Sequence, residues 1–128
     1  MIGTNDFYGS IAVIYDELFP YQPAQKAFVL SAFKGIAANG TVLDVGCGTG
    51  SLIVDLAHHF GLTYGMDPDQ DMLDQAWVKV LSEAVPTTFI PGGMLDIAAN
   101  FDQNSLDGIL CLGNTLVHLT DEDQVSEM

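Results

Sequence analysis

The apolar residues of this chain alternate between two kinds of pattern. Short apolar or β-branched runs predict strands over residues 42–45, 62–66, 87–90 and 106–112. Between these runs, apolar side chains recur at three- and four-residue spacing, which predicts amphipathic helices. Strands that alternate with helices favour a parallel sheet with right-handed crossovers. The pattern therefore predicts a doubly wound α/β fold.

Proline, glycine and capping residues set the expected limits of the helices. Two N-terminal helices are predicted, over residues 7–19 and 23–37, followed by helices at 50–60 and 69–85. Asp69 is the expected N-cap of the last of these. A loop with a short helix follows, and another helix is expected to begin near residue 120. The apolar sides of the four helices are expected to be Ile11, Ile14, Tyr15 and Leu18; Ala27, Leu30, Phe33, Ile36 and Ala37; Leu52, Ile53, Leu56, Ala57 and Phe60; and Met72, Leu73, Ala76, Trp77, Val80 and Leu81.

Composition narrows the range of partners. The chain has 128 residues, 48% of them hydrophobic, which suffices for the core of one domain. Three Lys, no Arg and 17 Asp plus Glu give a formal net charge of −14. Such a charge repels phosphate backbones and anionic lipid, so we expect neither nucleic acid nor membrane as a partner.

The cysteines and the N-terminal sequence favour the cytoplasm. Cys47 and Cys111 lack the spacing of a zinc site or a redox pair, so free thiols in a reducing compartment and no metal are expected. The N-terminus lacks the pattern of a signal peptide, and no apolar run reaches membrane-spanning length. The sequence predicts a cytoplasmic location.

A glycine-rich segment follows the first predicted strand and carries the strongest chemical signal. Gly46, Gly48 and Gly50 precede a helical pattern, where a ligand could approach peptide N–H groups without meeting a Cβ atom. The dinucleotide fingerprint needs a third small residue at the position of Ser51, and serine departs from its usual glycine or alanine. A P-loop is excluded because it needs a lysine directly after the glycines, and no lysine lies between Lys34 and Lys79.

Residues 43–50, with the sequence LDVGCGTG, resemble the first motif of the class I S-adenosylmethionine-dependent methyltransferases. The resemblance implies a Rossmann-like sheet of seven strands in the order 3-2-1-4-5-7-6. This chain would supply strands one to four of a truncated domain, with an N-terminal helical lid over residues 1–40 and the partial cofactor domain over 41–128. S-adenosylmethionine is the implied cofactor, held at its methionine end by the glycine segment.

Other segments resemble later parts of the family pattern. Asp67 matches the acid that accepts from both ribose hydroxyls, although a simple helix-capping acid is the alternative. Met72 matches an adenine contact or is plain core, and Asp96 matches an acceptor for the adenine amino group or is a surface acid. The resemblance implies these cofactor-binding residues: Tyr15, Asp44, Gly46, Cys47, Gly48, Gly50, Asp67, Pro68, Met72, Met94, Leu95, Asp96, Leu112 and Gly113.

The end of the fourth predicted strand bears on the methyl acceptor. Residues 112–119, with the sequence LGNTLVHL, resemble the glycine and sarcosine N-methyltransferases, and the Asp/Asn-Pro-Pro-aromatic motif of nucleic-acid amino methyltransferases is absent. Asn114 and His118 are the candidate catalytic residues this implies, with a structural histidine as the alternative for His118. Tyr15 is implied to donate to the cofactor carboxylate, and with no Arg in the chain, Lys26 is the nearest basic candidate.

Together these features predict an enzyme that transfers a methyl group to a small-molecule amine or oxygen. A non-catalytic S-adenosylmethionine-binding or assembly protein is the alternative, and an NAD-dependent oxidoreductase is a remote one. An uncovered edge of the fourth strand would invite pairing with another copy, so we expect a homo-oligomer.

Overall fold

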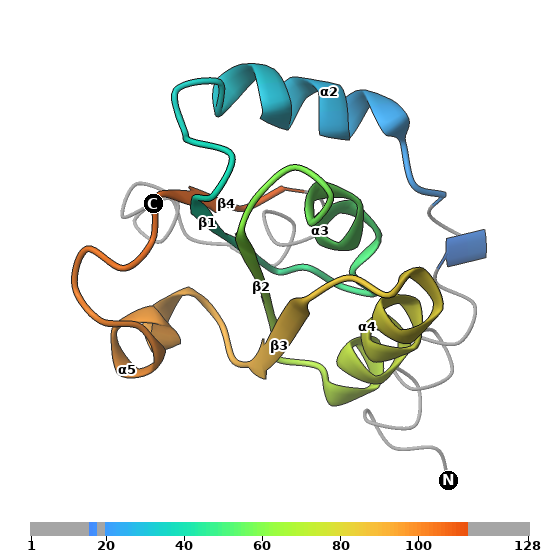
Figure 1. The fold of residues 1–128 in the computed structure, drawn as a ribbon. Coiled ribbons are helices and arrows are strands. Elements are labelled where there is room, and N and C mark those ends of the chain that lie inside the picture. Colours follow the sequence, from blue (N-terminus) through green and yellow to red (C-terminus); the bar gives the residue numbers. More distant parts are fainter. Residues whose placement is uncertain (1–15, 18–19, 113–128) are drawn as a thin grey trace, which may run out of the picture.

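The computed structural model describes residues 16–17 and 20–112, which form a parallel sheet flanked by helices (Figure 1). The four strands are β1 (Thr41–Val45), β2 (Leu62–Asp67), β3 (Thr87–Pro91) and β4 (Gly108–Leu110). They lie in the order β3-β2-β1-β4, and every neighbouring pair is parallel. The prediction of a parallel sheet with the order 3-2-1-4 is confirmed.

The helices connect the strands in chain order. They are α2 (Pro23–Ala32), α3 (Ser51–Leu56), α4 (Gln70–Glu83), the 3-10 turn η1 (Met94–Asp96) and α5 (Ile97–Asn100). Figure 1 shows α5 set apart from α2, α3 and α4. Within the described part of the chain, none of these helices has the length and apolar character needed to cross a membrane.

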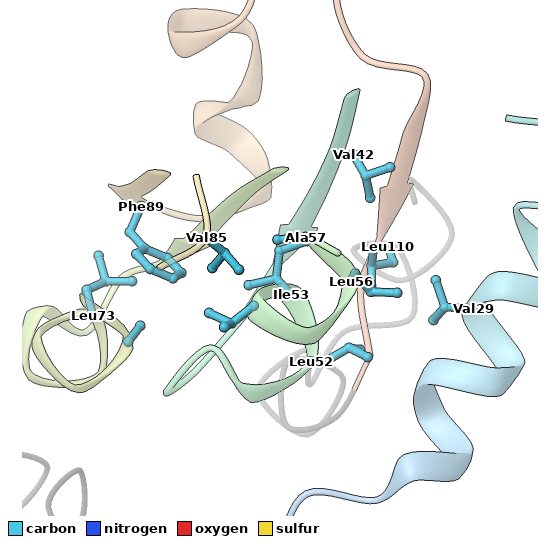
Figure 2. Packing of buried hydrophobic residues seen from close by; sticks show 12 residues of the cluster. Val29, Val42, Leu52, Ile53, Leu56, Ala57, Leu73, Val85, Phe89 and Leu110 are labelled. Atoms are coloured by element: carbon cyan, nitrogen blue, oxygen red, sulfur yellow. The ribbon is translucent and has the colours of Figure 1, made fainter. Parts of the chain in front are cut away.

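One face of the sheet carries the larger hydrophobic cluster, to which α2, α3 and α4 all contribute (Figure 2). Val29 reaches it from α2, Ile53 and Leu56 from α3, Leu73 from α4 and Leu110 from β4. Ile53, Leu56 and Leu73 are almost completely buried. Each buried aliphatic side chain of this size contributes roughly 1.5–3 kcal/mol of transfer free energy. This cluster fixes α3, and with it the glycine segment just before α3, against the sheet.

The other face is covered by the segment between β3 and β4. Leu43, Val45 and Met66 form its buried cluster, and the rings of Tyr64 and Phe101 pack against this cluster. The two rings meet each other edge to face, with centroids 5.0 Å apart. Strand β1 is therefore buried on both sides, as its apolar residues Val42, Leu43 and Val45 predicted.

Helix α2 is shorter than the predicted helix over residues 23–37. Helix α2 ends at Ala32, and its buried residue is Val29 rather than Ala27, which is exposed. The chain leaves the helix so that Ile36 can lie over the starts of β1 and β4. A Cβ atom at Gly108 would come within 2.7 Å of the Ile36 side chain. The exposed Ala37 is likewise not part of a buried stripe.

Two other helices also differ in detail from the prediction. Helix α3 ends at Leu56 instead of residue 60. On α4, Leu81 is 81% exposed, and Trp77 is 39% exposed although its ring packs against Phe89. A short sheet needs only a narrow buried stripe on α4, so the outer members of the apolar pattern face solvent. The N-cap prediction is confirmed, because the Asp69 carboxylate accepts from the Asp71 N–H at 2.9 Å.

Parts of the prediction fall outside the described residues. These are nearly all of the helix at 7–19, the segment 113–119 and the helix near residue 120. The fourth strand lies inside the described residues and is shorter than the predicted 106–112, since β4 spans Gly108–Leu110.

Candidate functional site

The glycine segment forms a tight turn at the carboxyl end of β1. Gly46, Gly48 and Gly50 have φ angles of 76°, 58° and 82°. These angles lie in the left-handed region, which side chains with a Cβ atom adopt only at a cost. The alternating glycines of the motif are therefore explained by the backbone path of the turn.

The peptide N–H groups of the turn are used inside the protein. Those of Gly46 and Cys47 both donate to the Met66 carbonyl, at 2.7 and 2.9 Å. The Gly50 N–H donates to the Cys47 carbonyl at 3.0 Å. The Gly48 N–H donates to a side chain, the Asp67 carboxylate, at 3.0 Å. These four N–H groups of the turn therefore have acceptors inside the protein, in β2 and in the turn itself.

Asp67 is placed at the end of β2, directly beside the turn. Its Oδ2 accepts from Gly48 N–H, and its Oδ1 accepts from Asp69 N–H at 2.9 Å. These two contacts orient the carboxylate at the end of β2. The helix-capping alternative does not describe this geometry, since the N-cap side chain of α4 is Asp69.

Asp44 is a second acid behind the turn, 4% exposed at the end of β1. Burial raises its pKa well above the usual range, and the negative charge of Asp67 raises it further. Burial, with Asp44 and Asp67 nearby, also raises the pKa of the Cys47 thiol. The end of β1 and the turn therefore bring two acids and a thiol close together, and nearby positive charge would favour the ionised form of each acid.

The raised pKa of Asp44 predicts how stability depends on pH. The folded chain holds this proton at a higher pH than the unfolded chain does, so stability falls as pH rises through the folded pKa. An Asp44→Asn variant has no such proton to lose. Its free energy of unfolding should therefore fall less between pH 5 and pH 8 than that of the wild type. Urea unfolding at the two pH values measures the effect. The exposed Asp102→Asn variant is the control, and an equal pH dependence in both variants would contradict this account.

A packing contact that the sequence did not reveal supports the turn from beneath. The Phe89 ring of β3 lies against two glycines: a Cβ atom at Gly65 would come within 2.7 Å of it, and one at Gly50 within 3.2 Å. The Gly50 position is also closed by the Ala76 side chain, at 2.9 Å. Gly65 lies on β2 and Ala76 on α4. Their small size leaves room for the Phe89 ring and for Gly50, a role that only the fold reveals.

The predicted adenine side is built from the segment after β3. Gly92, with φ of 138°, donates from its N–H to the Asp67 carbonyl at 3.1 Å, which brings this segment to the end of β2. The Asp96 carboxylate accepts from Gly93 N–H at 2.8 Å and is held close to the backbone. Leu95 is 89% exposed, and Met94 is half-buried against the second hydrophobic cluster.

The remaining predicted residues fall into two groups. Met72 is buried and Pro68 is exposed, while Leu112 is half-buried against the first cluster. The residues outside the described part of the chain are Tyr15, Gly113, Asn114 and His118.

Lys26, the basic candidate for the cofactor carboxylate, has a structural partner. Its Nζ lies 3.3 Å from Asp55 Oδ1, and the Tyr21 hydroxyl donates to Asp55 Oδ2 at 2.8 Å. Both contacts tie the start of α2 to α3.

Comparison with known proteins agrees with this geometry. The family model described as a methyltransferase domain matches residues 42–128. A protein of Geobacillus sp. (strain WCH70), named as a methyltransferase, is 32% identical over 124 residues, covering 94% of this chain and 49% of that protein. The chain thus spans about half the length of this curated relative.

Solved structures show the same fold. An S-adenosylmethionine-dependent methyltransferase from Clostridium acetobutylicum has a TM-score of 0.73 at 24% identity, over 94% of this chain and 50% of that chain. A second, from Thiobacillus denitrificans, is in complex with S-adenosylhomocysteine. It has a TM-score of 0.61 at 24% identity, over 84% of this chain and 43% of that chain.

The sheet order and the glycine turn define the class as a Rossmann-like, class I methyltransferase fold. Because the family model covers more than half of the chain, this chain belongs to the methyltransferase domain family, as residues 43–50 predicted.

Proposed function

We propose that the protein is an S-adenosylmethionine-dependent methyltransferase acting on a small-molecule amine or oxygen, and that this chain is its cofactor-binding half. The observation that carries the proposal is the polarity of the glycine turn. The amides of Gly46, Cys47, Gly48 and Gly50 are bonded internally, whereas the carboxyl groups of Asp44 and Asp67 lie beside the turn. Two acids at this place favour a ligand with cationic groups and a diol.

The same observation weighs against a dinucleotide. Pyrophosphate binding in the dinucleotide folds relies on backbone N–H groups of the glycine turn and of the helix start. Here the four amides named above already have acceptors, and one of those acceptors is the anionic side chain of Asp67. A phosphate placed at this turn would also lie close to the Asp67 carboxylate, which repels it.

In the proposed reaction the chain contributes binding and orientation. Asp67 would accept from the ribose hydroxyls while Gly48 and Asp69 hold its two oxygens in place. Positive charge on the methionine end would in turn favour the ionised form of Asp44, and Asp96 or the backbone beside it would contact the adenine. The cofactor would supply a methyl group on a cationic sulfur. An electron pair of the acceptor would form a bond to that methyl carbon as the carbon–sulfur bond breaks. Orientation of the two reactants and exclusion of water account for much of the rate in such a transfer.

Calorimetry on the full-length protein tests this proposal. We expect S-adenosylmethionine and S-adenosylhomocysteine to bind and NAD to give no heat. Binding of NAD alone would contradict the proposal. A screen of small amines and alcohols with methyl-labelled cofactor then separates an enzyme from a non-catalytic binding protein, because only the enzyme yields a labelled acceptor.

We also propose a cytoplasmic homo-oligomer that pairs through the β4 edge. Among the described strands β4 has β1 as its neighbour, and the Ile109 side chain is 48% exposed. Size-exclusion chromatography with light scattering tests the oligomer, and a monomer at all concentrations would contradict it.

A further inference from the structure

Asp16, which precedes α2 by a few residues, contacts the glycine turn and α4 at once. The Thr49 hydroxyl donates to Asp16 Oδ1 at 2.5 Å, and Lys79 Nζ lies 2.6 Å from Asp16 Oδ2. Thr49 lies inside the turn, between Gly48 and Gly50, and Lys79 lies on α4. One carboxylate therefore joins three segments that are distant in the sequence.

The two contacts differ in strength. Thr49 is only 2% exposed, so its hydroxyl depends on a protein partner, and loss of that partner would leave a buried polar group unsatisfied. The Lys79 and Asp16 side chains are 26% and 48% exposed, and ion pairs of that exposure contribute little to stability by themselves. The hydroxyl bond is the stronger link, and Lys79 chiefly orients the carboxylate that makes it.

The position of Thr49 is coupled to the proposed ribose site through one peptide unit. Its neighbour Gly48 donates the N–H that holds Asp67 Oδ2. Asp16 thus fixes the turn from one side, while Asp67 is held on the other. A shift of Thr49 would move the Gly48 N–H and release one of the two backbone contacts that orient Asp67.

We propose that Asp16 is a positioning residue of the cofactor site, and that cofactor affinity depends on its bond to Thr49. This inference rests on the proposed function, since it concerns the same pocket. It assigns a role in cofactor binding to a residue outside the glycine motif, which does not itself touch the cofactor.

A double-mutant cycle in the full-length protein tests the inference, with S-adenosylhomocysteine affinity measured by calorimetry. Asp16→Ala and Thr49→Val are each expected to weaken binding about tenfold, or roughly 1.4 kcal/mol, because the cofactor would then have to order a turn that Asp16 no longer holds. The double variant should bind no more weakly than either single variant. Asp16→Asn keeps an oxygen acceptor for Thr49, so it should restore most of the affinity. Glu17→Ala, at the exposed neighbouring position, is the matched control and should bind as the wild type does.

Thermal unfolding of each variant without ligand separates positioning from stability. Lowered melting temperatures with unchanged affinity would overturn the inference, and so would independent, additive losses in the double variant. Should Asp16→Ala fail to fold, the other two variants still decide the question. The inference requires that Asp16→Asn lose little affinity for S-adenosylhomocysteine and that Thr49→Val lose about tenfold. If the wild-type protein binds no S-adenosylhomocysteine, the proposed function itself fails. Wild-type binding that Asp16→Ala leaves unchanged overturns only this inference.

Discussion

Replacement of Asp67 by asparagine is expected to weaken S-adenosylhomocysteine binding by about 100-fold. The asparagine keeps the shape but loses the charge and one acceptor oxygen. Hydrogen bonds to a charged group contribute about 1.5–3 kcal/mol each, and two to the ribose diol account for the expected factor. The variant also loses a backbone contact, because an amide nitrogen cannot accept from Gly48 or Asp69. Calorimetry on the full-length protein measures the change.

Asp102→Asn is the matched control for this variant, since it removes the same charge at an exposed position. It should leave the affinity unchanged. An Asp67→Asn protein that binds within threefold of the wild type would show that this carboxylate does not hold the ribose.

Substitution of Gly50 by alanine is expected to damage both stability and binding. A left-handed backbone costs an alanine roughly 1–2 kcal/mol, and forcing a methyl group into a filled site costs about 1–3 kcal/mol more. The new Cβ atom would lie 2.9 Å from the Ala76 Cβ, which has no rotamer by which to move away. Urea unfolding should therefore show a loss of about 2–5 kcal/mol, by the sum of these two costs.

Gly35→Ala provides the control, because a Cβ atom there meets nothing within 4 Å. We expect its unfolding free energy to change by less than about 1 kcal/mol, a range typical of exposed substitutions. Equal stability of the two alanine variants would contradict the close packing of the turn against α4 and β3.

The fold was largely predictable because strand signals are local. Buried parallel strands are continuous apolar runs, and all four predicted strands form in the described structure. Helix limits were less predictable, since they depend on distant neighbours. Helix α2 ends at Ala32, and Ile36 then lies against Gly108, a contact between residues far apart in sequence. Leu81 fits the helical period, yet no part of the sheet extends beneath it, and it remains exposed.

The site divides in the same way. The glycines of the turn and Asp67 lie in local motifs, and the structure brings them together as the motifs predict. The sequence could not show that the turn's own amides are satisfied, because their acceptors, such as the Met66 carbonyl, belong to another strand. The contacts of Phe89 with Gly65 and of Asp16 with Thr49 also join residues of different segments, and no pattern of residue spacing in the sequence predicts them.

The central claim is that the turn at Gly46–Gly50 and its neighbours form an S-adenosylmethionine pocket. Amide chemical shifts of the full-length, nitrogen-15-labelled protein during titration with S-adenosylhomocysteine test it most directly. The account predicts that the shifts concentrate at Gly46–Gly50, at Asp67–Asp69 and at Gly92–Asp96, with Lys34 and Gly35 unaffected. Shifts that avoid these three segments, or that appear with NAD and not with S-adenosylhomocysteine, would contradict it.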